Sequence, residues 1–148
     1  LTGSVSEKEH TEHLAKTMGK GAYSLAGHLA LSQFVQLIKA ASLVVSVNTA
    51  TVHISAAVKT PIVVLYALTN PQHLPWNGKG KLLLFDVPEV LRSKNEVIQY
   101  VQNYLHPIIG EKPSPKDIVE AIRGLLFDKT NMCIPEMVPL RKPADQAI

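Results

Sequence analysis

The sequence has little of several features that mark particular classes of protein. Its 148 residues include a single cysteine, Cys133, which excludes a disulfide within the chain and a cysteine-cluster metal site. The longest uninterrupted apolar stretch covers residues 62–68, far short of the roughly 20 residues that span a bilayer. No internal repeat or low-complexity segment occurs. These absences favour an ordinary globular domain in a reducing compartment.

The chain also lacks a large excess of positive or negative charge. Fifteen Lys and Arg residues stand against twelve Asp and Glu residues, a net charge of +3 with neutral histidines. This excess is small and scattered, so we expect no binding to nucleic acid. The chain shows no basic amphipathic helix that would hold it at an anionic membrane. It also begins without Met, a basic leader or a hydrophobic leader, and we expect a cytoplasmic protein.

The segment between Leu43 and Val58 is the most informative one that is present. A short apolar, β-branched run stops at polar residues and restarts as small residues with apolar ones at helical spacing, which is typical of a buried parallel strand that leads into a helix. The first amides of such a helix lack internal partners, and the helix dipole adds about half a positive charge. The turn therefore favours a phosphate. Asn48 or Thr49 can cap the helix and leave other donors free.

Strand and helix patterns alternate along the rest of the chain. Helices are expected over residues 6–18, 31–41, 49–58, 94–105 and 115–127. A capping box of Ser6 and Glu9 would start the first helix, and Ser114 would cap the last. Strands are expected over residues 43–47, 62–66 and 81–86, with a short extended piece at 23–25. This alternation predicts an α/β fold with a parallel sheet and right-handed crossovers.

Several ordered motifs carry a family resemblance. They are Leu1-Thr2-Gly3-Ser4 with Glu7, Leu25-Ala26-Gly27, Asn48-Thr49-Ala50-Thr51-Val52-His53, Thr60-Pro61 and Thr69-Asn70-Pro71. This series resembles the C-terminal half of glycosyltransferase family nine, the heptosyltransferases of lipopolysaccharide core assembly, over about residues 1–76, with a weaker match near residues 114–127. The resemblance implies a Rossmann-like parallel sheet with flanking helices over residues 1–128, the donor-binding half of a two-domain GT-B glycosyltransferase. Three prolines and the lack of apolar periodicity from Lys129 onward predict a tail over residues 129–148.

The resemblance also implies a phosphate site. In the family this turn holds the diphosphate of the donor, and by position those roles fall on Asn48, Thr49, Ala50, Thr51 and His53. A lone histidine at a helix start can equally serve the structure alone. Two residues depart from the family pattern: Asn48 replaces an aspartate and Ala50 replaces a glycine. If the glycine serves a positive φ, the alanine costs about 1 kcal/mol, and donor affinity or activity could change.

Other candidate residues lie on two further segments. Glu7 stands where the family has a glutamate that reaches the ribose hydroxyls, although it could instead stabilise its own helix dipole. Thr69, Asn70, His73 and Trp76 form a loop beyond the end of a strand, where open α/β sheets bind ligands. His73 and Trp76 could line the cleft for the donor or the acceptor. They could instead pack against the domain and hold the loop in place. The pair His10 and His13 is expected on a solvated helix face.

The resemblance implies an inverting enzyme that transfers heptose from an ADP-activated donor to a lipopolysaccharide core acceptor, without a metal or other cofactor, in the cytoplasm or at the inner face of its membrane. Family members carry an acceptor-binding domain and a first βα unit upstream. We therefore expect a fragment that lacks the catalytic base and has an open sheet edge, which would recruit a second copy. The alternatives are a non-catalytic nucleotide-sugar-binding or assembly module, and another two-domain enzyme such as a nucleotide-sugar epimerase.

Overall fold

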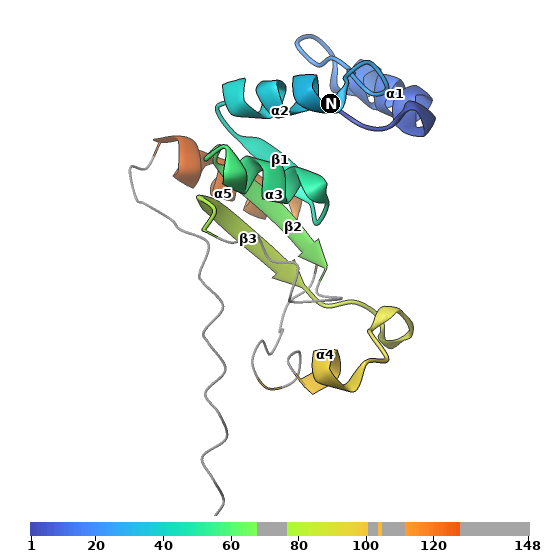
Figure 1. Ribbon diagram of the computed structural model, residues 1–148, viewed down its shortest axis with the longest axis vertical. Helices are drawn as coiled ribbons and strands as arrows, with labels where there is room; N and C mark the ends of the chain where they lie inside the picture. The colour runs from blue at the N-terminus through green and yellow to red at the C-terminus, as the bar shows by residue number, and fades with distance from the viewer. Residues whose placement is uncertain (68–76, 101–103, 105–111, 128–148) are drawn as a thin grey trace, which may run out of the picture. The chain divides into compact units, whose positions relative to one another are not determined.

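The computed structural model describes residues 1–67, 77–100, 104 and 112–127. The chain folds into two compact units, a first unit of residues 1–40 and a second unit of residues 41–148. The elements are η1 (Val5–Glu7), α1 (Lys8–Met18) and α2 (Leu31–Ala40) in the first unit, and β1 (Val44–Val47), α3 (Ala50–Ala57), β2 (Ile62–Ala67), β3 (Gly80–Phe85), η3 (Glu89–Leu91), α4 (Glu96–Tyr100) and α5 (Pro115–Phe127) in the second (Figure 1).

The predicted order of strands and helices is confirmed in the described residues. Most element ends lie within one or two residues of the prediction. The helix expected over residues 94–105 also begins two residues later than predicted, as α4, because the Oδ1 atom of Asn95 accepts hydrogen bonds from the amides of Val97 and Ile98 and caps the helix there. Its predicted end at residue 105 lies outside the described residues. The tail predicted over residues 129–148 lies outside the described residues.

In the first unit, two extended segments run parallel to each other. The amino group of Leu1 donates to the carbonyl of Tyr23 at 2.6 Å, the amide of Leu25 donates to Leu1 at 2.8 Å, and the amide of Gly27 donates to Gly3 at 3.0 Å. Because α1 lies between these segments in the sequence, the first unit has the order of a βαβ unit. The extended piece predicted at residues 23–25 is one of the two paired segments.

The start of α1 differs from the prediction. The capping box of Ser6 and Glu9 is wrong, since the box is formed by Ser4 and Glu7. The chain already turns at Val5 into the 3-10 turn η1, and this brings the carboxylate of Glu7 back to Ser4. The other end of α1 agrees with the prediction, because Gly19 follows Met18 with a φ of 84°.

The second unit is built on three parallel strands in the order β1-β2-β3. Val45 pairs with Val63 of β2, which in turn pairs with Lys81 of β3. Gly80 opens β3 beside Ile62, and any β-carbon there would overlap the carbonyl oxygen of Ile62. Only glycine lets the two strands approach at this point.

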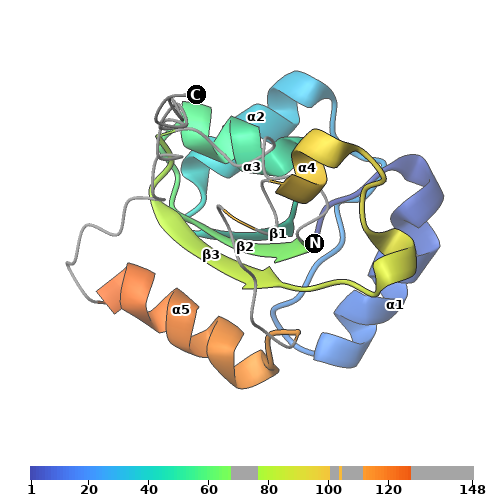
Figure 2. The same cartoon turned by 90° about the horizontal axis from the view of Figure 1, so that it is seen from below.

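Helices cover both faces of this sheet (Figure 2). On one face, Val52 of α3 packs with Ile62, Val64 and Tyr66 of β2, all fully buried. Burial also raises the pKa of Tyr66 to about 12. On the other face, Ala121 and Leu125 of α5 pack on Val63. The core of the second unit therefore lies around β2, the central strand.

The strand β1 is less buried than predicted. Val45 and Val47 are 45% and 56% exposed, although the apolar run predicted a strand buried on both faces. The physical reason is that β1 lies at the edge of the three-stranded sheet, and that α5 packs on Val63 of the neighbouring strand instead.

Within the described residues, every helix is too short or too polar to cross a membrane.

Candidate functional site

The best candidate site lies where β1 ends and α3 begins. Thr49 occupies the N-cap position with extended backbone angles, φ −136° and ψ 178°, but its side chain makes no capping hydrogen bond. Its hydroxyl lies 3.3 Å from the hydroxyl of Ser46, which donates to the carbonyl of Val47 at 2.9 Å. The side chain that should close the helix start is thus turned towards the preceding strand.

This arrangement leaves backbone donors open. The amide of Val52 donates to the carbonyl of Thr49 at 3.0 Å, whereas within the described part of the chain the amides of Ala50 and Thr51 have no hydrogen-bond partner. Both amides belong to the first turn of α3, where the helix dipole is positive. An anion placed at this turn would therefore meet unsatisfied donors and a favourable field.

The remaining predicted residues lie on the same turn. Asn48 and Thr51 are partly buried, while Thr49, Ala50 and His53 are exposed. No described side chain or carbonyl accepts a hydrogen bond from the imidazole of His53. All five residues therefore gather at the carboxyl end of β1, with hydroxyl, amide and imidazole groups that can donate to a phosphate.

Ala50 does not carry the backbone strain that its departure from the family pattern suggested. Among the described residues, the non-glycine residues with a positive φ are Lys59 and Asn77, and Ala50 is the first residue of α3. The cost of about 1 kcal/mol for a left-handed alanine therefore does not arise here. What the alanine adds is an exposed methyl group on the turn.

Glu7, the predicted ribose-binding residue, belongs to the first unit. Its Oε2 atom accepts hydrogen bonds from the amide and the hydroxyl of Ser4 at 2.8 and 2.6 Å. The hydroxyl of Ser4, followed by its amide and the nearby charge of His10, holds the pKa of Glu7 below its ordinary value. The carboxylate is thus ionised and oriented, and its contact with a ribose stays a prediction. Thr69, Asn70, His73 and Trp76 lie outside the described residues.

Sequence reasoning missed an ion pair just beyond β3. A nitrogen of Arg92 lies 2.5 Å from the Oδ2 atom of Asp86, and the Oδ1 atom of Asp86 accepts the amide of Val87 at 2.8 Å. The pair closes the turn through η3 at the edge of the sheet where the strands end (Figure 1). The partners are six positions apart in the sequence and follow no periodic pattern, so the sequence carries no signal for the ion pair.

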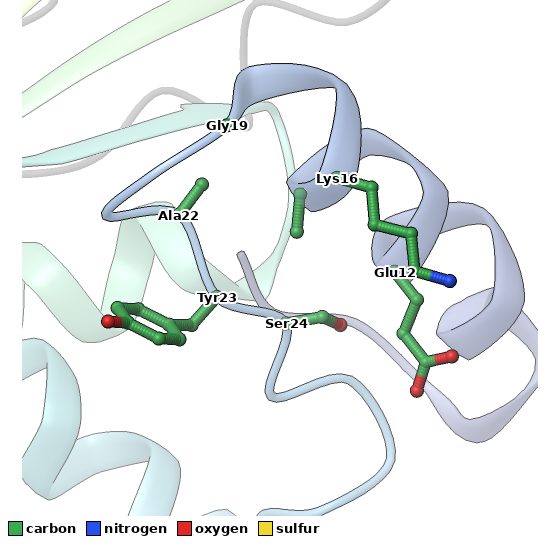
Figure 3. Close-up of a pocket in the computed structure, with 7 residues that line it drawn as sticks. Glu12, Lys16, Gly19, Ala22, Tyr23 and Ser24 are labelled. Atoms are coloured by element: carbon green, nitrogen blue, oxygen red, sulfur yellow. The ribbon is translucent and has the colours of Figure 1, made fainter.

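A shallow hollow of about 340 Å³ lies in the first unit. Its lining residues are Glu12, Ala15, Lys16, Gly19, Ala22, Tyr23 and Ser24. Figure 3 shows Glu12 and Lys16 extending from α1 while Tyr23 reaches away on the other side. The hollow lies beside the C-terminal half of α1, and Glu7 precedes the other end. Within the described ranges, no group of three or more His, Cys, Asp or Glu side chains could hold a metal ion.

Comparisons with known proteins agree on one family. Residues 1–96 match the family model described as glycosyltransferase family 9 (heptosyltransferase). No curated protein matches the chain significantly. Among solved structures, the chain is similar to the crystal structure of a family 9 glycosyl transferase from Veillonella parvula DSM 2008, with 16% identity and a TM-score of 0.61. The match covers 84% of this chain but only 35% of that one, and it shows a common fold.

Proposed function

This chain belongs to glycosyltransferase family 9, the heptosyltransferase family, and on that premise we propose that it binds the diphosphate of a nucleotide-sugar donor at the start of α3. One observation carries the proposal. The family match includes the turn of residues 48–53, and the amides of Ala50 and Thr51 on this turn have no partner among the described residues. A family motif thus coincides with open hydrogen-bond donors.

The proposed contacts follow from the chemistry of the turn. The two open amides donate to non-bridging phosphate oxygens, as helix N-termini commonly do. The hydroxyl of Thr49 can rotate away from Ser46 and donate as well, because the two oxygens are 3.3 Å apart. His53 donates to the diphosphate from the first turn of α3. The side-chain amide of Asn48 supplies a further donor.

Glu7 is the proposed partner of the donor's ribose. Ser4 uses the Oε2 atom of the carboxylate, which leaves Oε1 without a partner among the described residues. An ionised carboxylate accepts hydrogen bonds from the hydroxyls of a vicinal diol. The hydrogen bonds from Ser4 would then hold Glu7 in place for that contact and keep it charged.

The finer assignment concerns the donor and the acceptor. We propose an ADP-heptose-like donor and a lipopolysaccharide core acceptor, as part of a two-domain GT-B enzyme. An acceptor oxygen forms the new bond to the anomeric carbon, the bond from that carbon to the diphosphate breaks, and a base from outside these 148 residues takes the proton. In this scheme the start of α3 stabilises the charge that develops on the leaving diphosphate.

Calorimetric titration of the chain with ADP and with UDP tests the proposal. We expect ADP to bind more tightly than UDP. An equal or reversed preference would remove the heptosyltransferase assignment and leave the phosphate site standing. If neither nucleotide binds, the proposal for this turn is wrong.

We also expect the 148-residue chain to transfer no sugar by itself. Transfer requires an acceptor hydroxyl with a base within about 3 Å of it, and a donor held in line. A donor analogue should therefore bind while an assay for the released nucleoside diphosphate stays at the background rate. Sugar transfer by the chain alone would show that the base lies within these residues.

Asn48 favours a second candidate, a non-catalytic nucleotide-sugar-binding or assembly module. The family usually has an aspartate at this position, and the amide lacks its charge. Such a module would bind the nucleotide as described but would not support transfer in the full-length protein either. An assay of the full-length protein with donor and acceptor separates the two candidates. The epimerase alternative receives no support from the family match.

A further inference from the structure

Two of the motifs that carry the family resemblance meet in the first unit. The second of the two paired extended segments ends at Gly27, whose amide donates to the carbonyl of Gly3 at 3.0 Å. The amide of His28 donates to the carbonyl of Leu25 at 3.1 Å and closes a four-residue turn, in which Gly27 is the third residue with a φ of 73°. This turn therefore lies beside the segment that leads to Glu7.

The absence of a side chain at Gly27 lets η1 lie against this turn. A β-carbon added to Gly27 would lie 3.1 Å from the α-carbon of Val5 and 3.3 Å from its Cγ2 atom. Since Val5 is the first residue of η1, the atom that would have to move belongs to the backbone of η1. The positive φ is a second constraint, because residues with a β-carbon rarely adopt it.

Gly3 makes a similar approach to Glu7 itself. A β-carbon added to Gly3 would lie 3.1 Å from the Oε2 atom of Glu7 and 3.2 Å from its Cβ atom. This Oε2 atom accepts the amide and the hydroxyl of Ser4. On the side of the neighbouring segment, Ala26 is fully buried and lies 3.5 Å from the same added carbon. The glycine pair, Gly3 and Gly27, thus leaves room for η1 and for the carboxylate in the position that Ser4 holds.

We propose that the glycine pair positions the carboxylate of Glu7 for the vicinal diol of a ribose, and thereby sets a preference for a ribonucleotide donor. This inference rests on the proposed function, in which Glu7 binds the donor's ribose. Neither glycine touches the ribose, because Gly3 acts through Glu7 and Gly27 acts through the backbone of Val5. A binding group must be held within about 0.5 Å of its productive place, and a β-carbon at either position displaces its neighbour by a few tenths of an ångström. We therefore expect a partial loss of the ribose contact when either glycine is replaced.

Calorimetric titration of the full chain with ADP and with 2′,3′-dideoxy-ADP measures this preference. The unmodified chain should bind ADP about tenfold more tightly, because the analogue lacks the two hydroxyls that donate to a charged group. Gly27→Ala and Gly3→Ala should each lower the ratio of the two affinities by about threefold or more. The affinity for 2′,3′-dideoxy-ADP should stay unchanged, since this nucleotide has no hydroxyl that Glu7 can accept.

Gly19→Ala is the matched control. Gly19 also has a positive φ, 84°, but nothing lies within 4 Å of a β-carbon added there. The control therefore introduces the backbone strain of Gly27→Ala without the close approach, and it should keep the ratio of the unmodified chain. Gly3→Ala introduces the close approach without the strain, because Gly3 has no positive φ. It serves as the test if Gly27→Ala does not fold, which circular dichroism checks.

A carboxyl NMR titration follows Glu7 without any nucleotide. Hydrogen bonds from Ser4 hold the pKa of Glu7 below 4.5, so a displaced carboxylate should titrate closer to that value. We expect this rise of the Glu7 pKa in Gly27→Ala and in Gly3→Ala, and no change in Gly19→Ala.

The outcomes separate this inference from the proposed function. If the unmodified chain prefers ADP but both variants of the glycine pair keep the ratio, the inference alone is wrong. An unchanged pKa of Glu7 in both variants overturns it too, as does an equal loss of the ratio in Gly19→Ala. If the unmodified chain binds the two nucleotides equally, the ribose contact of Glu7 is wrong and the inference fails with it.

Discussion

The starts of α1 and α3 both follow an extended segment and a polar turn, but they treat their backbone donors differently. Before α1, the carboxylate of Glu7 accepts the amide and the hydroxyl of Ser4. Before α3, Thr49 holds the N-cap position without a capping hydrogen bond. The 3-10 turn η1 that leads into α1 is thus closed by a capping box, although Glu7, the N-cap of α1 itself, makes no capping hydrogen bond either. The start of α3 has neither feature and leaves its donors open.

The start of α5 resembles the closed turn. Ser114 donates through its amide and its hydroxyl to the carboxylate of Asp117 at 2.8 and 2.7 Å, and the amide of Asp117 donates back at 3.3 Å. A serine and an acidic residue three positions later thus close two of the helix starts. Between Lys39 and Lys59 the sequence has no acidic residue that could do the same for α3. A turn that its own sequence leaves open is the one that can accept an anionic ligand.

The largest expected effect comes from removing the polar groups of the open turn. His53→Ala and Thr49→Val should each weaken ADP binding by about 1 to 3 kcal/mol, because each removes a donor to a charged phosphate. Calorimetric titration measures the change. His13→Ala is the control, since His13 is exposed on α1 and should bind ADP like the unmodified chain. Unchanged affinity in both test variants would assign the two residues a purely structural role.

A second test compares the two kinds of helix start without any ligand. Ser114→Ala should lower the free energy of unfolding by about 1 kcal/mol, because it removes a cap that is present. Thr49→Ala should lower it by less than about 0.5 kcal/mol, because no capping bond is lost. Urea denaturation of both variants gives the two values. An equal loss would mean that Thr49 caps α3 in solution and that the contrast between the turns is wrong.

A third test restores the family residues. If the two departures from the family pattern are what weaken the turn, Asn48→Asp with Ala50→Gly should raise ADP affinity by about 0.5 to 1 kcal/mol, because the glycine removes a methyl group beside the open amides and this gain must exceed the loss of the Asn48 donor. The glycine should at the same time destabilise the chain by about 0.5 to 1 kcal/mol. Titration and urea denaturation measure the two effects. Weaker ADP binding would show that the turn is adapted to its own residues.

The smallest effect concerns pH. Hydrogen bonds from Ser4 lower the pKa of Glu7 from its ordinary value of 4.5, and those from Ser114 lower the pKa of Asp117 from 3.8. A lowered pKa in the folded state means that each carboxylate stabilises the fold above its ordinary value, and that this contribution disappears as the pH falls through the folded value. The start of α3 has no such group.

A carboxyl NMR titration below pH 5 tests this contrast. Glu7 and Asp117 should titrate below 4.5 and 3.8. Ser4→Ala should move the pKa of Glu7 back up towards its ordinary value and leave Asp117 unchanged. If Glu7 titrates at its ordinary value in the unmodified chain, the turn before α1 is not closed in solution.

Local patterns explain why much of the fold could be predicted. Strand and helix periods are short-range signals, and the five residues of the candidate turn lie within the six positions 48–53, so one segment predicted both the helix start and its chemistry. The capping box was misplaced because Ser6 and Glu9 have the same spacing as Ser4 and Glu7. Only the backbone turn at Val5 decides between them.

The remaining differences depend on contacts between distant segments. The apolar run of β1 could not reveal that α5 packs on Val63 and leaves Val45 exposed. The ion pair of Asp86 and Arg92 has no counterpart in any periodic pattern. Such features depend on tertiary packing, which a residue pattern does not carry.

The close approach of β3 to β2 at Gly80 has a consequence for how this sequence can change over evolutionary time. Every substitution at Gly80 adds a β-carbon where the carbonyl oxygen of Ile62 already lies. Even alanine therefore cannot replace this glycine while the two strands keep their positions. Neighbouring Lys81 is exposed and can vary freely. In a saturation library of the chain, codon 80 should therefore tolerate no replacement, although its residue has no side chain.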